Sequence, residues 1–235
     1  MMDKRTILVG DVHGCAEELS LLAQKVGYKP GQDEMILVGD LVNRGPDSLG
    51  AWELFQDLKA RSVVGNHELH LIRDAAGIEV KKRWIEGFKA RFGDRFAAYL
   101  AEIRSWPLYL EREEFLVVHA GLWPGKHPQD TDPKALTSIR TWDGTGEDLQ
   151  SESNPPWFDF YTGKKLVVFG HWAKLGGVVR PNVVGLDTGC VYGKKLTALV
   201  LPEKELVSVE ALAVHCPITS HDWVDLNVTK NNGAS

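Results

Sequence analysis

Five short apolar runs of the sequence end beside glycine and are followed by residues that can bind a metal ion. Residues 7–10 lead to Asp11 and His13, and residues 35–39 lead to Asp40. The same pattern recurs three times downstream, where the runs lead to Asn66, His119 and His171. Apolar, β-branched runs predict buried strands, and functional groups gather at the carboxyl ends of parallel strands. We therefore expect these six side chains to form a metal site.

The ligand types favour a pair of divalent metal ions. Two metals about 3.5–4 Å apart can bind and activate water and hold phosphoryl oxygens during an in-line displacement. Asp11 and His13 are two apart at a strand end and point to the same side, while Asp40 would bridge both ions. Asn66, His119 and His171 would complete the second site. Nitrogen and oxygen ligands without thiolate suit manganese first, with iron, cobalt, nickel or zinc as alternatives, rather than calcium.

Each part of the pattern has a structural interpretation that competes with the metal site. A Gly-Asp pair after a strand is often a helix cap, and a single buried histidine is more often a core residue than a ligand. Four of the eight histidines, however, follow apolar runs. We expect the remaining four to be structural or solvated: His70, His127, His215 and His221. The joint pattern favours the metal site.

Composition indicates a globular, cytoplasmic protein. The chain has 235 residues, 43% of them hydrophobic and 25% charged, which predicts one domain over residues 1–235. A net charge of −5 argues against a general nucleic-acid coat protein. No signal peptide or membrane-spanning run is evident, and no obligate protein partner is indicated. The odd, widely spaced Cys15, Cys190 and Cys216 favour a reducing compartment.

Strand and helix patterns alternate in the first part of the chain, which predicts a mixed α/β fold with parallel strands joined by right-handed crossovers. A helical cap is expected at about 67–105, a hairpin at 108–112 and 115–120, and a long loop at 124–160 that holds one short helix. The other expected helices are 16–26 and 51–58. The other expected strands are 35–40, 62–64, 166–170, 183–186, 196–201 and 205–212. Residues 214–235 are expected to be a frayed tail.

Three motifs carry a resemblance to a known family. Gly10-Asp-x-His-Gly14, Gly39-Asp-x-x-x-Arg-Gly45 and Gly65-Asn-His-Glu68 together resemble the signature of the metallophosphoesterase superfamily, in its phosphoprotein-phosphatase-like branch. The segments 39–48, 65–70, 169–176 and 186–193 are most similar to those of bacterial symmetrical diadenosine tetraphosphatases. The resemblance covers about residues 5–212. It implies a calcineurin-like β-sandwich flanked by helices, with a dinuclear metal centre at its loop edge.

The resemblance also implies an activity and roles for individual residues. Diadenosine tetraphosphate would be cleaved to two ADP, and dinucleoside-polyphosphate caps on RNA 5′ ends are a further substrate that the family allows. His67 resembles the acid that protonates the leaving oxygen, and Arg44 resembles a bidentate phosphate clamp. Arg140 is expected to be a second clamp. Asn43 stands where related protein phosphatases have aspartate, and a neutral amide would orient His67 without raising its pKa. This departure favours an anhydride substrate with a good leaving group.

Two other functions remain open at this point. The first is a serine/threonine or tyrosine phosphoprotein phosphatase, since such relatives share the metal ligands, although Asn43 argues against it. The second is a non-catalytic binding module on an inactive enzyme fold, which the retention of His67 and of every ligand disfavours. A further departure is that the region between His119 and His171 is shorter than in typical tetraphosphatases. Aromatic residues in or near that region could stack on a base or pack in the core: Trp123, Trp142, Trp157, Phe158 and Tyr161.

Overall fold

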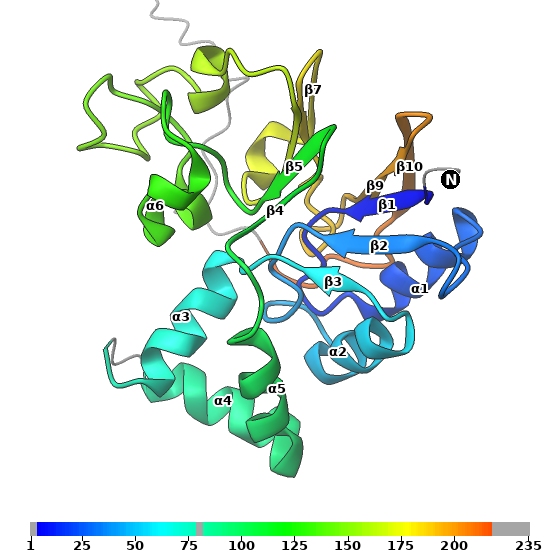
Figure 1. Cartoon of the computed structure of the whole chain (residues 1–235). Coiled ribbons are helices and arrows are strands. Elements are labelled where there is room, and N and C mark those ends of the chain that lie inside the picture. The colour runs from blue at the N-terminus through cyan, green and yellow to red at the C-terminus, as the bar shows by residue number, and fades with distance from the viewer. Residues whose placement is uncertain (1–3, 79–81, 218–235) are drawn as a thin grey trace, which may run out of the picture.

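The computed structural model describes residues 4–78 and 82–217, and these residues contain two mixed five-stranded sheets (Figure 1). The first sheet has the order β10-β9-β1-β2-β3, and the second has the order β4-β5-β6-β8-β7. The strands of the first sheet are β1 (Thr6–Val9), β2 (Glu34–Leu37), β3 (Arg61–Ser62), β9 (Lys195–Leu201) and β10 (Glu205–Glu210). Those of the second are β4 (Tyr109–Glu111), β5 (Phe115–Val118), β6 (Leu166–Phe169), β7 (Val178–Arg180) and β8 (Val183–Gly185).

Helices connect the parallel strands of the first sheet, as the alternation of patterns predicts. Helix α1 (Ala16–Lys25) joins β1 to β2, and α2 (Ser48–Asp57) joins β2 to β3. Leu19 and Leu22 of α1 are fully buried, as expected for the apolar stripe of an amphipathic helix. The Asp47 carboxylate caps α2 by accepting a hydrogen bond from the Gly50 amide at 2.8 Å. These crossovers align the carboxyl ends of β1, β2 and β3 at one sheet edge.

The two sheets enclose an apolar layer. Its buried side chains come from both sheets and include Leu8, Ile36, Val117 and Val168. A second apolar cluster joins the outer face of the first sheet to α1 and α2, and a third covers the second sheet. Figure 1 shows α1 and α2 beside the first sheet and α6 (Pro133–Ser138) on the side of the second. The expected sandwich of sheets flanked by helices is confirmed.

Helices also occupy the region between β3 and β4. They are α3 (Asn66–Ala75), α4 (Lys82–Phe92) and α5 (Phe96–Ile103), with a 3₁₀ turn at Gly93–Arg95. The rings of Phe92 and Tyr99 stack with centroids 4.7 Å apart, and Trp52 of α2 meets Tyr99 edge to face. This aromatic packing fixes α4 and α5 against α2. Helix α3 begins at Asn66, so the helix itself carries residues of the site.

The apolar runs that lead to metal-binding residue types divide between the two sheets, with β1, β2 and β3 in one and β5 and β6 in the other. The structure differs from the sequence predictions in two places. Strand β7 was not predicted, because its residues are half-buried or exposed. The predicted frayed tail begins too early: the amides of His215 and Cys216 donate to the Val191 carbonyl, and the buried Glu18 carboxylate binds His215 Nε2 at 2.7 Å. Residues 218–235 and His221 lie outside the described residues.

Candidate metal centre and phosphate-binding pocket

The ends of β1, β2 and β6 turn sharply, and this turn directs polar side chains into one region. His13, Asp40 and His171 adopt positive φ angles of 51°, 50° and 68°. Such angles are uncommon for residues other than glycine and persist where the surrounding structure enforces them. Asp11 and Asp40 are 3% and 2% exposed, although both are carboxylates. Buried carboxylates need partners, and these two share one small volume.

Two of the predicted ligands, His119 and His171, converge on the side-chain oxygen of a third, Asn66. Asn66 Oδ1 lies 2.9 Å from His119 Nε2 and 2.9 Å from His171 Nδ1. His119 Nδ1 lies 2.8 Å from the Val38 carbonyl oxygen. Because a carbonyl can only accept, Nδ1 carries the proton and Nε2 presents its lone pair. Two imidazole nitrogens and an amide oxygen at this spacing suit one divalent cation.

Asp40 lies between this cluster and a second one. Its Oδ2 atom is 3.5 Å from His119 Nε2 and 3.6 Å from His13 Nε2. His13 Nε2 is in turn 4.0 Å from Asp11 Oδ2. Asp40 therefore occupies the position that a bridging carboxylate needs, with Asp11 and His13 on one side and His119 on the other.

Glycines allow the polar side chains to approach the backbone closely. A Cβ atom at Gly170 would collide with Asp11 Oδ1, and one at Gly65 would collide with Asp40 Oδ1. The His171 amide, next to Gly170, lies 3.1 Å from both carboxylate oxygens of Asp11. The glycines of the motifs are thus required by close packing around the carboxylates.

The electrostatics of the cluster fit bound cations. Burial, followed by the charges of Asp187 and Asp40, raises the pKa of Asp11 well above its usual range. Burial likewise raises the pKa of Asp40 to about 7. Burial also lowers the pKa of His13 and His171, so both imidazoles are neutral and can act as ligands. Divalent cations would stabilise the ionised carboxylates, and the donor set therefore fits two such ions.

Glu68 supports the centre and was not predicted as a site residue. Its fully buried carboxylate accepts hydrogen bonds of 3.0 Å from the amides of Asp40, Leu41 and Gly65. These contacts fix the backbone that follows β2 against the start of α3. The signal was present in the sequence, because Glu68 belongs to the motif Gly65-Asn-His-Glu68.

The Asn43 amide contacts the ring of His67. Asn43 Nδ2 is 2.9 Å from His67 Nδ1, while Asn43 Oδ1 accepts a 2.9 Å hydrogen bond from the Arg44 amide. His67 Nε2 lies 3.9 Å from Asp40 Oδ2, beside the candidate bridging carboxylate. Burial lowers the pKa of His67 well below its usual value, and the charges of His13 and Arg44 lower it further.

A pocket opens above these groups, and both predicted phosphate clamps line it. Arg44 and Arg140 share it with His67 and His171. Arg44 donates to the Tyr192 hydroxyl and lies over the Tyr192 ring. Guanidinium groups in this position suit bidentate binding of phosphate oxygens. The structure thus brings all the predicted site residues together, and their roles as ligands, acid and clamps remain predictions.

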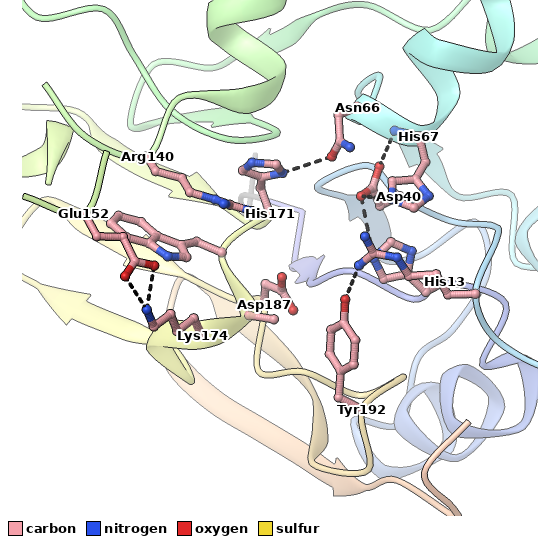
Figure 2. A pocket seen from close by; sticks show the side chains of 13 residues that line it. His13, Asp40, Asn66, His67, Arg140, Glu152, His171, Lys174, Asp187 and Tyr192 are labelled. Atoms are coloured by element: carbon pink, nitrogen blue, oxygen red, sulfur yellow. Dashed lines mark hydrogen bonds and ion pairs between the residues drawn. The ribbon is translucent and has the colours of Figure 1, made fainter. Parts of the chain in front are cut away.

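Six further residues that the sequence did not single out line the pocket: Glu152, Trp172, Ala173, Lys174, Asp187 and Tyr192. Figure 2 shows Asp187 near the middle of the pocket and Tyr192 beside it. Asp187 follows the apolar run 183–186, which is the same signal that marked Asp11 and Asp40. No comparable signal marks Glu152, which lies in the long loop.

The remaining predictions concern side chains away from the pocket. His127 lies 3.4 Å from Glu111 on the surface, and His215 pairs with Glu18, as expected of structural or solvated histidines. Trp142 and Trp157 are buried, so core packing is their observed use. No helix within residues 4–78 and 82–217 has the length and apolar character needed to cross a membrane.

A sandwich of two mixed sheets, with paired carboxylates and imidazoles beside two arginines, defines a metal-dependent phosphoester hydrolase. The chain belongs to the Calcineurin-like phosphoesterase family, whose model matches residues 4–175. Among curated relatives, a symmetrical bis(5′-nucleosyl)-tetraphosphatase of Janthinobacterium sp. (strain Marseille) is 31% identical, over 87% of this chain and 96% of the relative.

Two further similarities span most of the chain. An asymmetrical bis(5′-nucleosyl)-tetraphosphatase of Oceanobacillus iheyensis is 32% identical, over 96% of this chain and 98% of the relative. A crystal structure assigned provisionally as a diadenosine tetraphosphatase superposes with a TM-score of 0.79 at 33% identity. It covers 89% of this chain and 95% of its own. The resemblance inferred from the motifs is confirmed at the level of the family.

Proposed function

We propose that the protein hydrolyses diadenosine tetraphosphate symmetrically to two ADP, using two divalent metal ions, with manganese the first choice. The Asn43–His67 contact carries this proposal, because an amide partner suits an acid that assists a good leaving group. The likeness to a symmetrical tetraphosphatase over nearly its whole length supports the same substrate. Hydrolysis of dinucleoside-polyphosphate caps on RNA, and a cytoplasmic location, remain predictions from the sequence.

The proposal assigns specific ligands to each of the two metal ions. Asp11, His13 and Asp40 would hold the first ion, and Asp40, Asn66, His119 and His171 the second. When bound, the ions lower the pKa of a water molecule toward neutrality and neutralise charge on the phosphoryl oxygens.

The protein's own side chains then act on the substrate. Arg44, with Arg140, binds non-bridging oxygens of the attacked phosphate and holds the bridge in line for attack. The bond between phosphorus and the bridging oxygen breaks as the water oxygen bonds to phosphorus. The Nε2–H group of His67 donates a hydrogen bond to the departing oxygen of ADP, which leaves as an anion, and Asn43 keeps the ring oriented for this contact.

Competition between two substrate classes tests this proposal. The manganese-loaded protein is given diadenosine tetraphosphate and a phosphoserine peptide, and kcat/KM is measured for each. We expect the dinucleotide to be strongly preferred, because a diphosphate leaves more readily than a serine alkoxide. A higher kcat/KM for the peptide would instead indicate a phosphoprotein phosphatase and contradict the role given to Asn43.

A further inference from the structure

A lysine lies in the wall of the pocket that contains the candidate metal ligands. Lys174 lies in the short 3₁₀ turn Ala173–Leu175, three residues after His171. Its side chain is 8% exposed, and Nζ lies 2.5 Å from both carboxylate oxygens of Glu152. Its charge therefore borders a pocket that already contains Arg44 and Arg140.

Arg140 has an unused donor on the same side of the pocket. Its Nε atom is buried without a hydrogen-bond partner. Buried donors in native proteins are normally satisfied, and an orphaned one calls for an explanation such as an absent ligand. A phosphate oxygen is the acceptor that a guanidinium and an ammonium would share.

This side of the pocket lies away from the leaving group. Figure 2 shows Lys174 and Glu152 at one end of the pocket and His67 at the other, with Asp187 between them. In the proposed reaction the leaving ADP departs toward His67, whose Nε2–H group donates a hydrogen bond to its departing oxygen. The part of the substrate that stays joined to the attacked phosphorus must then extend toward another wall, and Lys174 offers a cation there.

We propose that Lys174 and the Nε–H group of Arg140 form a subsite for the phosphate that stays joined to the attacked phosphorus, while the other donors of Arg140 bind the attacked phosphate. The phosphate in the subsite becomes the α-phosphate of one ADP. Glu152 holds the ammonium in position while the subsite is empty. The inference rests on the proposed function and deepens it. A symmetrical cut leaves one phosphate between the attacked phosphorus and the nucleoside, and the subsite holds that phosphate.

A purely structural ion pair would have different consequences. If the Lys174–Glu152 contact only fastens the long loop to the sheet, then removing either charge has the same effect. If Lys174 binds phosphate, Glu152 competes with the ligand for the ammonium. K174Q and E152Q should then change phosphate affinity in opposite directions.

The test is equilibrium binding of ADP and AMP to the manganese-loaded protein, measured by isothermal titration calorimetry. AMP offers only the phosphate that lies at the metals, whereas ADP also fills the subsite. We expect K174Q to weaken ADP binding by about tenfold or more while changing AMP binding little. E152Q should strengthen ADP binding severalfold. The matched control is K165Q, which removes a Lys–Glu pair of the same 2.5 Å length with Glu111 and should leave ADP affinity unchanged.

Thermal unfolding of each variant establishes that it is folded. Unchanged ADP affinity in K174Q, or weaker ADP binding in both K174Q and E152Q, overturns the subsite. A different result would reject the proposed function without rejecting the subsite. If ADP binding depends on Lys174 but the protein leaves diadenosine tetraphosphate intact, the subsite is retained and the proposed substrate is rejected.

Discussion

Asn43 Nδ2 lies 2.9 Å from His67 Nδ1, and the orientation of that amide is fixed by its other end. The Arg44 amide donates to Asn43 Oδ1 at 2.9 Å, so the carbonyl side of the amide faces Arg44 and the NH₂ side faces His67. An NH₂ group can only donate, and His67 Nδ1 is therefore the acceptor. The single proton of the neutral ring is then on Nε2, the atom that lies 3.9 Å from Asp40 Oδ2.

Replacing Asn43 with aspartate should change the dependence of the rate on the leaving group. A carboxylate would accept a hydrogen bond from Nδ1–H and so raise the pKa of His67, which burial and the charges of His13 and Arg44 hold well below its usual value. The more basic, more often protonated ring should assist poor leaving groups. We expect N43D to gain on alkyl phosphates relative to diadenosine tetraphosphate. Rates for aryl phosphates of graded leaving-group pKa measure this directly, and an unaltered slope in N43D would count against the Asn43 account.

His67→Asn tests the assigned acid. Removing a positioned proton donor should lower kcat by about 10²–10⁴-fold. Metal content should stay the same, because His67 is not among the proposed ligands. Metal analysis by mass spectrometry and steady-state kinetics provide the two readouts. Loss of bound metal in H67N would place His67 among the ligands instead, a possibility that its distance of 3.9 Å from Asp40 makes worth measuring.

The number of metal ions bound per chain distinguishes a carboxylate that binds both ions from a residue that binds only one. Asp40 Oδ2 lies within 3.6 Å of imidazole nitrogens on both sides, so D40N should lose both ions. The His171 ring contacts Asn66 through Nδ1, and both are proposed ligands of the second ion only. H171A should therefore lose one ion. Metal content per chain after exhaustive dialysis gives the answer, with circular dichroism as the check on folding. Equal loss in both variants would argue against a bridging role for Asp40.

Metal affinity should rise as pH increases toward neutrality. Burial raises the pKa of Asp40 from 3.8 to about 7, so the carboxylate is protonated below that pH and must lose its proton to bind metal. Below this value we expect affinity to fall by about tenfold per pH unit for each proton displaced. The same raised pKa makes the metal-free protein less stable as pH rises through about 7, since a buried carboxylate must then ionise. Calorimetric titrations in buffers of different ionisation enthalpy count the released protons, and a count of zero at pH 6 would refute this prediction.

The sequence predicted the parts of the fold that follow from hydrophobic periodicity. The apolar runs before Asp11 and Asp40 became adjacent parallel strands, and α1 and α2 lie where the patterns placed them. The division of the runs between two sheets was available only through the family resemblance. Each run is buried on both faces in either arrangement, so periodicity does not determine which runs pair.

The sequence predicted the site residues that have a metal-binding side chain and follow the end of an apolar run. Asp187 follows an apolar run in the same way as Asp40, but it was noted only as part of a family motif. Glu152 and Lys174 are 22 residues apart in sequence and meet because the long loop folds back toward the turn after β6. A charged residue in a polar loop has the same local pattern whether it faces solvent or a pocket, and the sequence could not distinguish the two cases.

The central claim is tested most directly by the products formed from diadenosine tetraphosphate. The manganese-loaded protein is incubated with the dinucleotide, and the nucleotides are separated by anion-exchange chromatography at early times. If cleavage is symmetrical, ADP is the sole nucleotide product. ATP and AMP in equal amounts would instead show asymmetrical cleavage and contradict the proposed position of the attacked phosphorus.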